Sequence, residues 1–154
     1  MFQNANPHIQ HLLWIVVLLL GLLPITQAQG TTHSAGYAII IQGSSINHKG
    51  EDAYNKTLNR VYQRLLDRGF TTDDIRYFNY DDSQDNVYAI PSIEGIKSTI
   101  ETWAVNKINH SPAPLYIIMV DHGNPKQFFL GKDNITPAVL NTWLNKLEIG
   151  LAKY

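Results

Sequence analysis

Three short apolar segments, separated by helical patterns, constrain the fold of this chain more than any other feature. The first spans residues 37–43 and reads YAIIIQG, the second is centred on residues 75–78, and the third, residues 115–120, reads LYIIMV. Continuous apolar runs of this length are typical of strands that a parallel sheet buries on both faces. The sequence therefore predicts three strands of a parallel sheet.

The segments between and after these strands have helical spacing. Apolar residues recur at helical intervals over 53–68, where Gly69 follows as a C-terminal cap, and over 93–108, where Ser92 is a candidate N-cap. Residues 127–133 predict a short hairpin, and Thr136 with Pro137 predicts the start of a last helix. Strands alternating with helices predict an α/β fold with flanking helices. A sheet of this kind would continue with another strand, so we expect it to be incomplete at the C-terminus.

Composition narrows the class of protein. The 154 residues suit one domain, and a net charge of −1 with a pI near 6.6 gives no reason to expect a nucleic-acid partner. The chain has no cysteine, which excludes disulfides and thiolate metal sites within it. Its 6 histidines have no metal-ligand spacing. We therefore expect neither a metal nor a cofactor.

The first 28 residues have the pattern of a secretory signal peptide. An apolar run from Leu12 to Leu23 ends at Pro24, and small residues precede a cleavage site predicted after Ala28. The segment before the run has no Lys or Arg, which departs from that pattern, so an uncleaved N-terminal anchor is the alternative. Residues 29–36 would be an exposed lead-in to a domain spanning 37–154, located outside the cell or in the periplasm.

A histidine follows the third strand directly, in the sequence VDHG. Functional residues of open α/β sheets gather beyond the carboxyl ends of the strands, where His122 and Gly123 lie. Histidine suits acid–base chemistry near neutral pH, and a glycine N–H can approach an oxyanion closely. The alternative is a histidine in an ordinary surface loop.

Three segments together resemble the legumain-type (C13) cysteine peptidases of the caspase-like superfamily, and particularly their bacterial exported members. They are YAIIIQGSS, LYIIMVDHGNPKQFF and ITPAVLNTWLNKL, and the resemblance runs in order from about Tyr37 to Leu147. It implies a caspase-like sheet, His122 as the catalytic histidine and the Gly123 amide as part of the oxyanion hole. It also implies an asparagine that orients the histidine. Asn47 is the nearest candidate, with an ordinary turn residue as the alternative.

The nucleophile of this family is a cysteine at the end of the next strand, and this sequence has none. The resemblance implies a fragment that stops before the nucleophile and is inactive alone, or else a pseudo-peptidase. We expect a cysteine endopeptidase fragment for peptide or protein substrates, of low stability because its last strand leaves a sheet edge uncovered. The alternative function is a secreted, non-catalytic α/β module that binds peptide or carbohydrate at its sheet-end loops. Residues 81–86 resemble part of a calcium loop but lack its glycine and final glutamate, which favours a solvated turn.

Overall fold

The computed structural model describes residues 35–44 and 51–152, and the fold is given for these residues alone. The predicted signal peptide, most of the predicted lead-in and Asn47 lie outside them. No helix among the described residues is both long and apolar enough to cross a bilayer.

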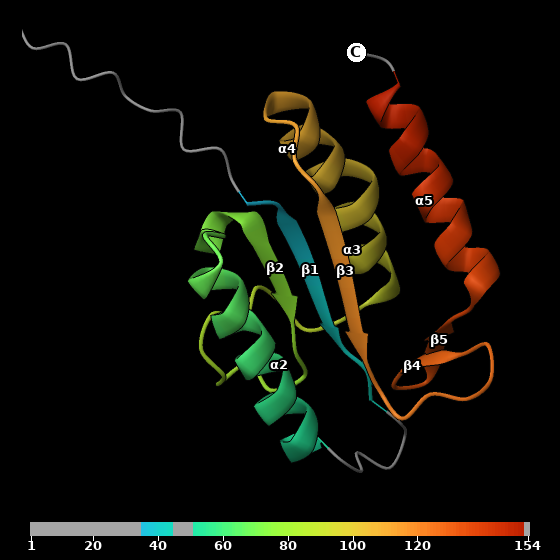
Figure 1. Cartoon of the computed structure of the whole chain (residues 1–154). Coiled ribbons are helices and arrows are strands. Elements are labelled where there is room, and N and C mark those ends of the chain that lie inside the picture. The colour runs from blue at the N-terminus through green and yellow to red at the C-terminus, as the bar shows by residue number, and fades with distance from the viewer. Residues whose placement is uncertain (1–34, 45–50, 153–154) are drawn as a thin grey trace, which may run out of the picture. The chain divides into compact units, whose positions relative to one another are not determined.

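A parallel sheet of three strands forms the centre of the fold (Figure 1). The strands are β1 (Tyr37–Gln42), β2 (Ile75–Phe78) and β3 (Leu115–Val120), in the order β2-β1-β3. Ile40 of β1 is in register with Tyr77 on one side and with Ile118 on the other. All 6 residues of β1 are buried. The prediction of three parallel strands, with the first buried on both faces, is confirmed.

Helix α2 (Glu51–Asp67) covers one face of the sheet. Its apolar stripe packs against alternate residues of β1 and β2, and this half of the core contains Ala38, Ile40, Leu58, Tyr62, Leu65, Phe70, Ile75 and Tyr77. The predicted cap Gly69 has φ 91°, and the Phe70 N–H returns to the Leu65 carbonyl at 3.1 Å. The short 3₁₀ helix η1 (Thr72–Asp74) then leads into β2.

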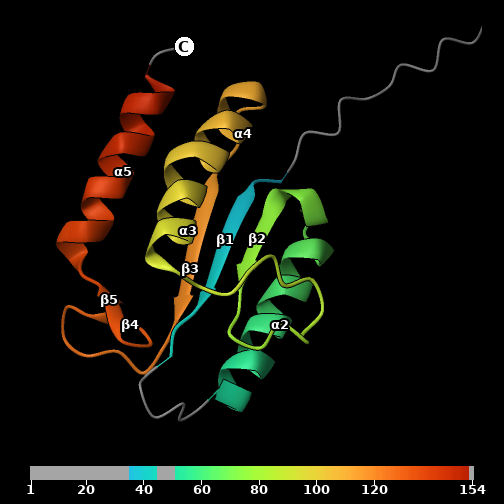
Figure 2. The same ribbon diagram turned by 180° about the vertical axis from the view of Figure 1, so that it is seen from behind.

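The opposite face is covered by the remaining helices (Figure 2). These are α3 (Ile93–Ser98), the π-helical segment η2 (Thr99–Ala104), α4 (Val105–His110) and α5 (Pro137–Leu151). Both predicted caps are confirmed: Ser92 accepts from Gly95 N, and Thr136 accepts from Val139 N. The single helix expected over 93–108 contains a π-helical middle. At its first residue, the Thr99 hydroxyl donates to the Gly95 carbonyl at 2.8 Å.

A two-stranded hairpin connects β3 to α5. Strands β4 (Phe128–Leu130) and β5 (Asp133–Ile135) pair antiparallel, and Gly131 in the turn has φ 63°. This confirms the predicted hairpin and its turn at Gly131-Lys132. The hairpin joins the sheet through Ser44, whose N–H donates to the Phe129 carbonyl at 3.1 Å and whose carbonyl accepts from Gly131 at 2.8 Å.

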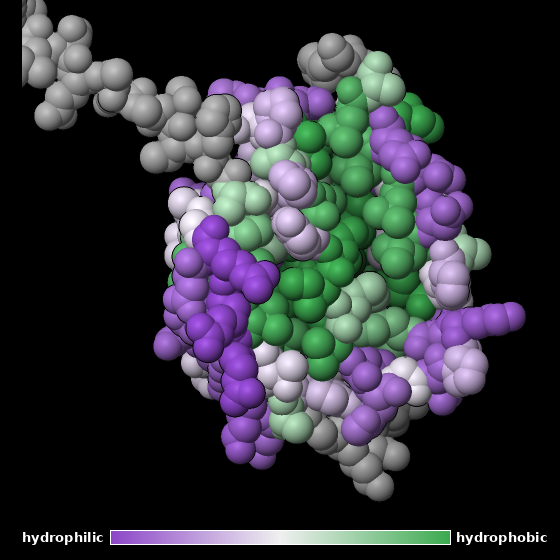
Figure 3. All heavy atoms as spheres, viewed as in Figure 1, coloured by the Kyte–Doolittle hydropathy of each residue, from purple (hydrophilic) through white to green (hydrophobic). Residues whose placement is uncertain are grey.

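Strand β3 corrects one expectation. Its sequence is apolar throughout, which favoured a strand buried on both faces. Among the described strands it pairs only with β1, and none of its residues is fully buried. Tyr116 is 46% exposed, and apolar surface spreads across this region of the molecule (Figure 3). The other edge of β3 is therefore open in the described part of the fold. This agrees with the expectation that the last strand leaves a sheet edge uncovered.

Candidate active site

His122 and Gly123 lie together at the carboxyl end of the sheet, as predicted. Asp121 follows the last residue of β3, and the exposed His122 comes next in a bend of the chain. Neither imidazole nitrogen has a hydrogen-bond partner among the described residues. Both ring nitrogens are therefore available for hydrogen bonds with a ligand.

Asp121 fixes the backbone of this loop. Its carboxylate accepts the His122 N–H at 2.6 Å through Oδ1 and the Phe129 N–H at 2.7 Å through Oδ2. It also lies over Gly43, where an added Cβ would come within 2.5 Å of Asp121 Cβ. The glycine after β1 thus makes room for the carboxylate, and the carboxylate ties the hairpin to the loop that carries His122.

Gly123 presents a backbone N–H beside the histidine. Its φ is 59°, a left-handed conformation that disfavours side chains with a Cβ. The chain then closes in a tight turn, in which Asn124 N donates to Gln127 O at 3.2 Å and Gln127 N donates back at 3.0 Å. The Gly123 N–H itself has no partner among the described residues. It is a donor available to a ligand.

Tyr54 of α2 contacts the imidazole ring of His122. The two rings meet edge to face, with centroids 5.2 Å apart and an interplanar angle of 72°. Tyr54 is 8% exposed, and its hydroxyl has no hydrogen-bond partner in the part of the chain that the structure describes. Burial, and next the negative charge of Asp121, raise the pKa of Tyr54, whereas the nearby backbone N–H of His122 acts in the opposite direction. That N–H is directed to the Asp121 carboxylate, so we regard the hydroxyl as unsatisfied.

Sequence reasoning missed both Tyr54 and the role of Asp121. Tyr54 belongs to a helical apolar stripe and gave no signal beyond packing. Asp121 stood beside the histidine in the motif, but its partner Phe129 could not be foreseen from local pattern. Asn47, the predicted orienting residue, lies outside the described residues, so its role is not tested.

No thiol is present to act with His122, because the sequence has no cysteine. Ser44 is near the end of β1 but is 1% exposed, and its backbone is engaged with the hairpin. It is therefore a poor nucleophile candidate. No group of three or more metal-ligating side chains occurs among the described residues.

A buried polar network lies at the same end of the sheet, beneath α2. Gln42 donates to Asn55 Oδ1 at 2.8 Å and Asn79 donates to the same oxygen at 2.9 Å. Gln42 Oε1 in turn accepts the Tyr80 N–H at 2.8 Å. Gln42 and Asn79 are 0% exposed. These side chains satisfy one another and join α2 to β1 and to the loop after β2.

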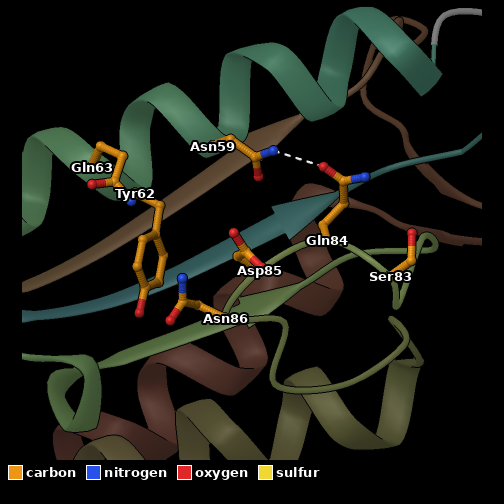
Figure 4. A pocket seen from close by; sticks show the side chains of 7 residues that line it. All are labelled: Asn59, Tyr62, Gln63, Ser83, Gln84, Asp85 and Asn86. Atoms are coloured by element: carbon orange, nitrogen blue, oxygen red, sulfur yellow. Dashed lines mark hydrogen bonds between the residues drawn. The ribbon is translucent and has the colours of Figure 1, made fainter.

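A polar pocket of about 220 Å³ opens beside that network, between α2 and the loop after β2. Its lining consists of Asn59, Tyr62, Gln63, Ser83, Gln84, Asp85 and Asn86 (Figure 4). Asn59 and Gln84 are joined across it by a hydrogen bond of 2.7 Å. Asp85 and Asn86 are exposed and supply polar groups at the rim.

Comparisons with protein-family models, with curated proteins and with solved structures found no match for this chain. The functional proposal below is therefore based on the fold and on the geometry of the site.

Proposed function

We propose that this chain carries the acid–base half of a legumain-type (C13) cysteine endopeptidase site, in an exported caspase-like domain. The observation that carries the proposal is the juxtaposition at the end of β3. Within residues 35–44 and 51–152, neither the imidazole of the exposed His122 nor the Gly123 N–H has a hydrogen-bond partner, and Gly123 has φ 59°. The parallel sheet between two helical layers supports the proposed domain type.

In the proposed reaction, a thiolate attacks the carbonyl carbon of the scissile peptide bond. The Gly123 N–H donates to the oxyanion that forms, and protonated His122 gives its proton to the departing amine. Neutral His122 then takes a proton from water as the water attacks the thioester carbon; the C–S bond breaks, which forms the carboxylic acid product and restores the thiolate and protonated His122. The thiol must come from outside these 154 residues, since they contain no cysteine. The chain alone should therefore not hydrolyse peptides.

The test is to sequence the transcript beyond the Tyr154 codon and to assay the product that it encodes. We expect a cysteine-bearing apolar strand and peptide hydrolysis that a thiol-directed inhibitor blocks. His122→Ala should lower kcat/KM by about 10²–10⁴-fold, the usual contribution of a general acid–base. His110→Ala, at the end of α4, is the matched control. Absence of a cysteine-bearing strand, or full activity in His122→Ala, would refute the proposal.

The polar pocket supports a second candidate, a non-catalytic module that binds a polar ligand such as a carbohydrate. Its volume of about 220 Å³ and its amide and carboxylate lining suit hydrogen-bonding ligands. If this function is correct, the full chain should bind at least one carbohydrate on a glycan array. Asp85→Ala or Asn86→Ala should abolish that binding. Asp82→Ala, in the same loop but outside the pocket, should leave binding intact. Binding that none of these changes affects would speak against the pocket.

A further inference from the structure

The contact between Tyr54 and His122 joins two elements that are far apart along the chain. Tyr54 belongs to the first turn of α2, and His122 is the second residue after β3. Figure 1 shows the start of α2 and the end of β3 at the same end of the sheet. Tyr54 is 8% exposed, whereas His122 is at the surface. A buried tyrosine ring thus packs against an exposed histidine ring.

The start of α2 is fixed to the end of β1 beside Tyr54. Asn55 is 9% exposed, and its Oδ1 accepts from Gln42 Nε2 at 2.8 Å. One turn further along the helix, Leu58 is 0% exposed and lies in the core between α2 and the sheet. Tyr54 is next to one of these anchors and one turn from the other. Its ring therefore has a defined position relative to the sheet.

The loop that carries His122 is fixed to the same end of β1. The Gly43 N–H donates to the Val120 carbonyl at 2.8 Å, and the Asp121 side chain packs over Gly43. The Asp121 carboxylate also accepts the backbone N–H of His122 at 2.6 Å. These contacts hold the main chain of His122, but they do not restrain rotation about its side-chain bonds. Tyr54 supplies a contact to the imidazole ring itself.

An aromatic contact can orient an imidazole without using its nitrogens. The ring centroids of Tyr54 and His122 are 5.2 Å apart at an interplanar angle of 72°, which is an edge-to-face arrangement. The Tyr54 hydroxyl, which has no partner in the described part of the chain, does not bond either imidazole nitrogen. A general acid–base needs a defined ring direction and an available nitrogen, because the proton passes over hydrogen-bond distance. The geometry of this pair meets both needs.

We propose that Tyr54 is a positioning residue, which holds the His122 imidazole in the orientation that proton transfer requires. The role in catalysis rests on the proposed peptidase function, whereas the restraint on the ring does not. The aromatic ring of Tyr54 makes the contact, and its hydroxyl adds no hydrogen bond within the described residues. Tyr54→Phe should therefore preserve the restraint. Tyr54→Leu, which removes the aromatic ring, should abolish it.

The first experiment measures the orientation of the imidazole by NMR spectroscopy of the full 154-residue chain. Couplings between the α and β protons of His122 report its χ1 rotamer. The wild type and Tyr54→Phe should show the couplings of a single rotamer, and Tyr54→Leu should show averaged couplings. Phe70→Leu is the matched control, since Phe70 is 7% exposed and meets Tyr116 edge to face, with centroids 5.8 Å apart. It should leave the His122 couplings unchanged.

The second experiment uses the longer product with the cysteine-bearing strand. Tyr54→Leu should lower kcat by about ten-fold with little change in KM, because it disturbs proton transfer rather than substrate binding. Tyr54→Phe should restore kcat, and Phe70→Leu should leave it nearly unchanged. In a His122→Ala background, Tyr54→Leu should have no further effect, since it acts through His122.

The two experiments separate this inference from the proposed function. A single His122 rotamer in Tyr54→Leu, or an equal loss of kcat in Tyr54→Leu and Phe70→Leu, would overturn the inference. So would a further loss of kcat when Tyr54→Leu is added to His122→Ala. If no cysteine-bearing strand follows, or if His122→Ala is fully active, the proposed function fails. The NMR comparison alone then decides whether Tyr54 holds the imidazole ring.

Discussion

Two tyrosines near the α2 layer illustrate how different the environment of a hydroxyl can be within one core. The Tyr77 hydroxyl donates to Asn59 Oδ1 at 2.9 Å and accepts from Asn79 Nδ2 at 2.6 Å. The Tyr54 hydroxyl, near His122, has no hydrogen-bond partner among residues 35–44 and 51–152. A buried polar group without a partner costs about 1–3 kcal/mol relative to a satisfied one. Tyr54 therefore contributes packing and a ring contact to His122, and we expect its hydroxyl to reduce stability.

We predict opposite effects for the same substitution at these two positions. Tyr54→Phe removes an unsatisfied hydroxyl and should raise the free energy of unfolding by about 1 kcal/mol. Tyr77→Phe removes the donor to Asn59 Oδ1 and one acceptor of the buried Asn79 amide, and should lower it by about 1–3 kcal/mol. Urea denaturation followed by circular dichroism measures both. Equal destabilisation of the two variants would show that the Tyr54 hydroxyl is hydrogen-bonded in solution.

At the scale of elements, the loop between β2 and α3 is organised around Asp81. Its carboxylate accepts from the Ser83 hydroxyl at 2.5 Å and from Gln84 Nε2 at 2.6 Å. These two hydrogen bonds, in that order, lower the pKa of Asp81 from its ordinary value. The Asn55 amide also donates to it, at 3.3 Å, which links the loop to α2. The ionised carboxylate therefore holds the loop against the helix.

The lowered pKa of Asp81 makes the stability of the fold depend on pH. Because the folded pKa lies below that of the unfolded chain, ionised Asp81 stabilises the fold above the ordinary aspartate pKa. This stabilisation is lost as pH falls through the lowered value. Asp81→Asn should reduce the loss of stability between neutral and acidic pH, whereas Asp82→Asn should not. Unfolding measured across this pH range tests the prediction, and identical profiles for the wild type and Asp81→Asn would contradict it.

Local signals in the sequence predicted the elements well. The apolar run of β1, the caps Ser92 and Thr136, and the turn at Gly131 each depend on a few neighbouring residues. The π-helical segment η2 was not predicted, because its apolar spacing resembles that of an ordinary helix. The partial exposure of the β3 side chains was not predicted for a related reason, since a strand apolar on both faces has the same sequence whether or not neighbours cover those faces.

Only part of the candidate site could likewise be predicted from the sequence. The position of His122 and Gly123 follows from a strand that ends in VDHG, a pattern readable in the sequence. The contact of His122 with Tyr54 and the anchoring of the hairpin by Asp121 join segments distant along the chain. So does the network of Gln42, Asn55 and Asn79. No local periodicity encodes such pairings, and only the packing of α2 and β4 against the sheet reveals them.

At the scale of the whole molecule, the fold leaves the apolar edge strand β3 near three arginines, Arg60, Arg64 and Arg68. Exposed edges invite pairing between copies of a chain, and charged residues near an edge oppose it. Two copies that met through β3 would bring Arg60 of each α2, and Arg68 directly after it, toward the same face. We infer that these cations keep copies of the chain apart at low ionic strength.

Salt should therefore promote self-association of the chain. From about 0.01 M to about 1 M salt the screening length falls from about 30 Å to about 3 Å, which removes most of the repulsion between exposed arginines. Sedimentation velocity of the full chain should show more association at high salt. Arg60→Gln with Arg68→Gln should produce that association at low salt.

The place of association is tested by adding a charge to β3. Tyr116 of β3 is 46% exposed, and Tyr116→Lys should suppress association at high salt by placing a cation at the edge where copies meet. Ile149, 61% exposed on α5, is the matched position, and Ile149→Lys should leave association unchanged. If both lysine variants behave alike, the copies meet elsewhere. If only Tyr116→Lys stays monomeric, copies of the chain associate through the open edge of β3.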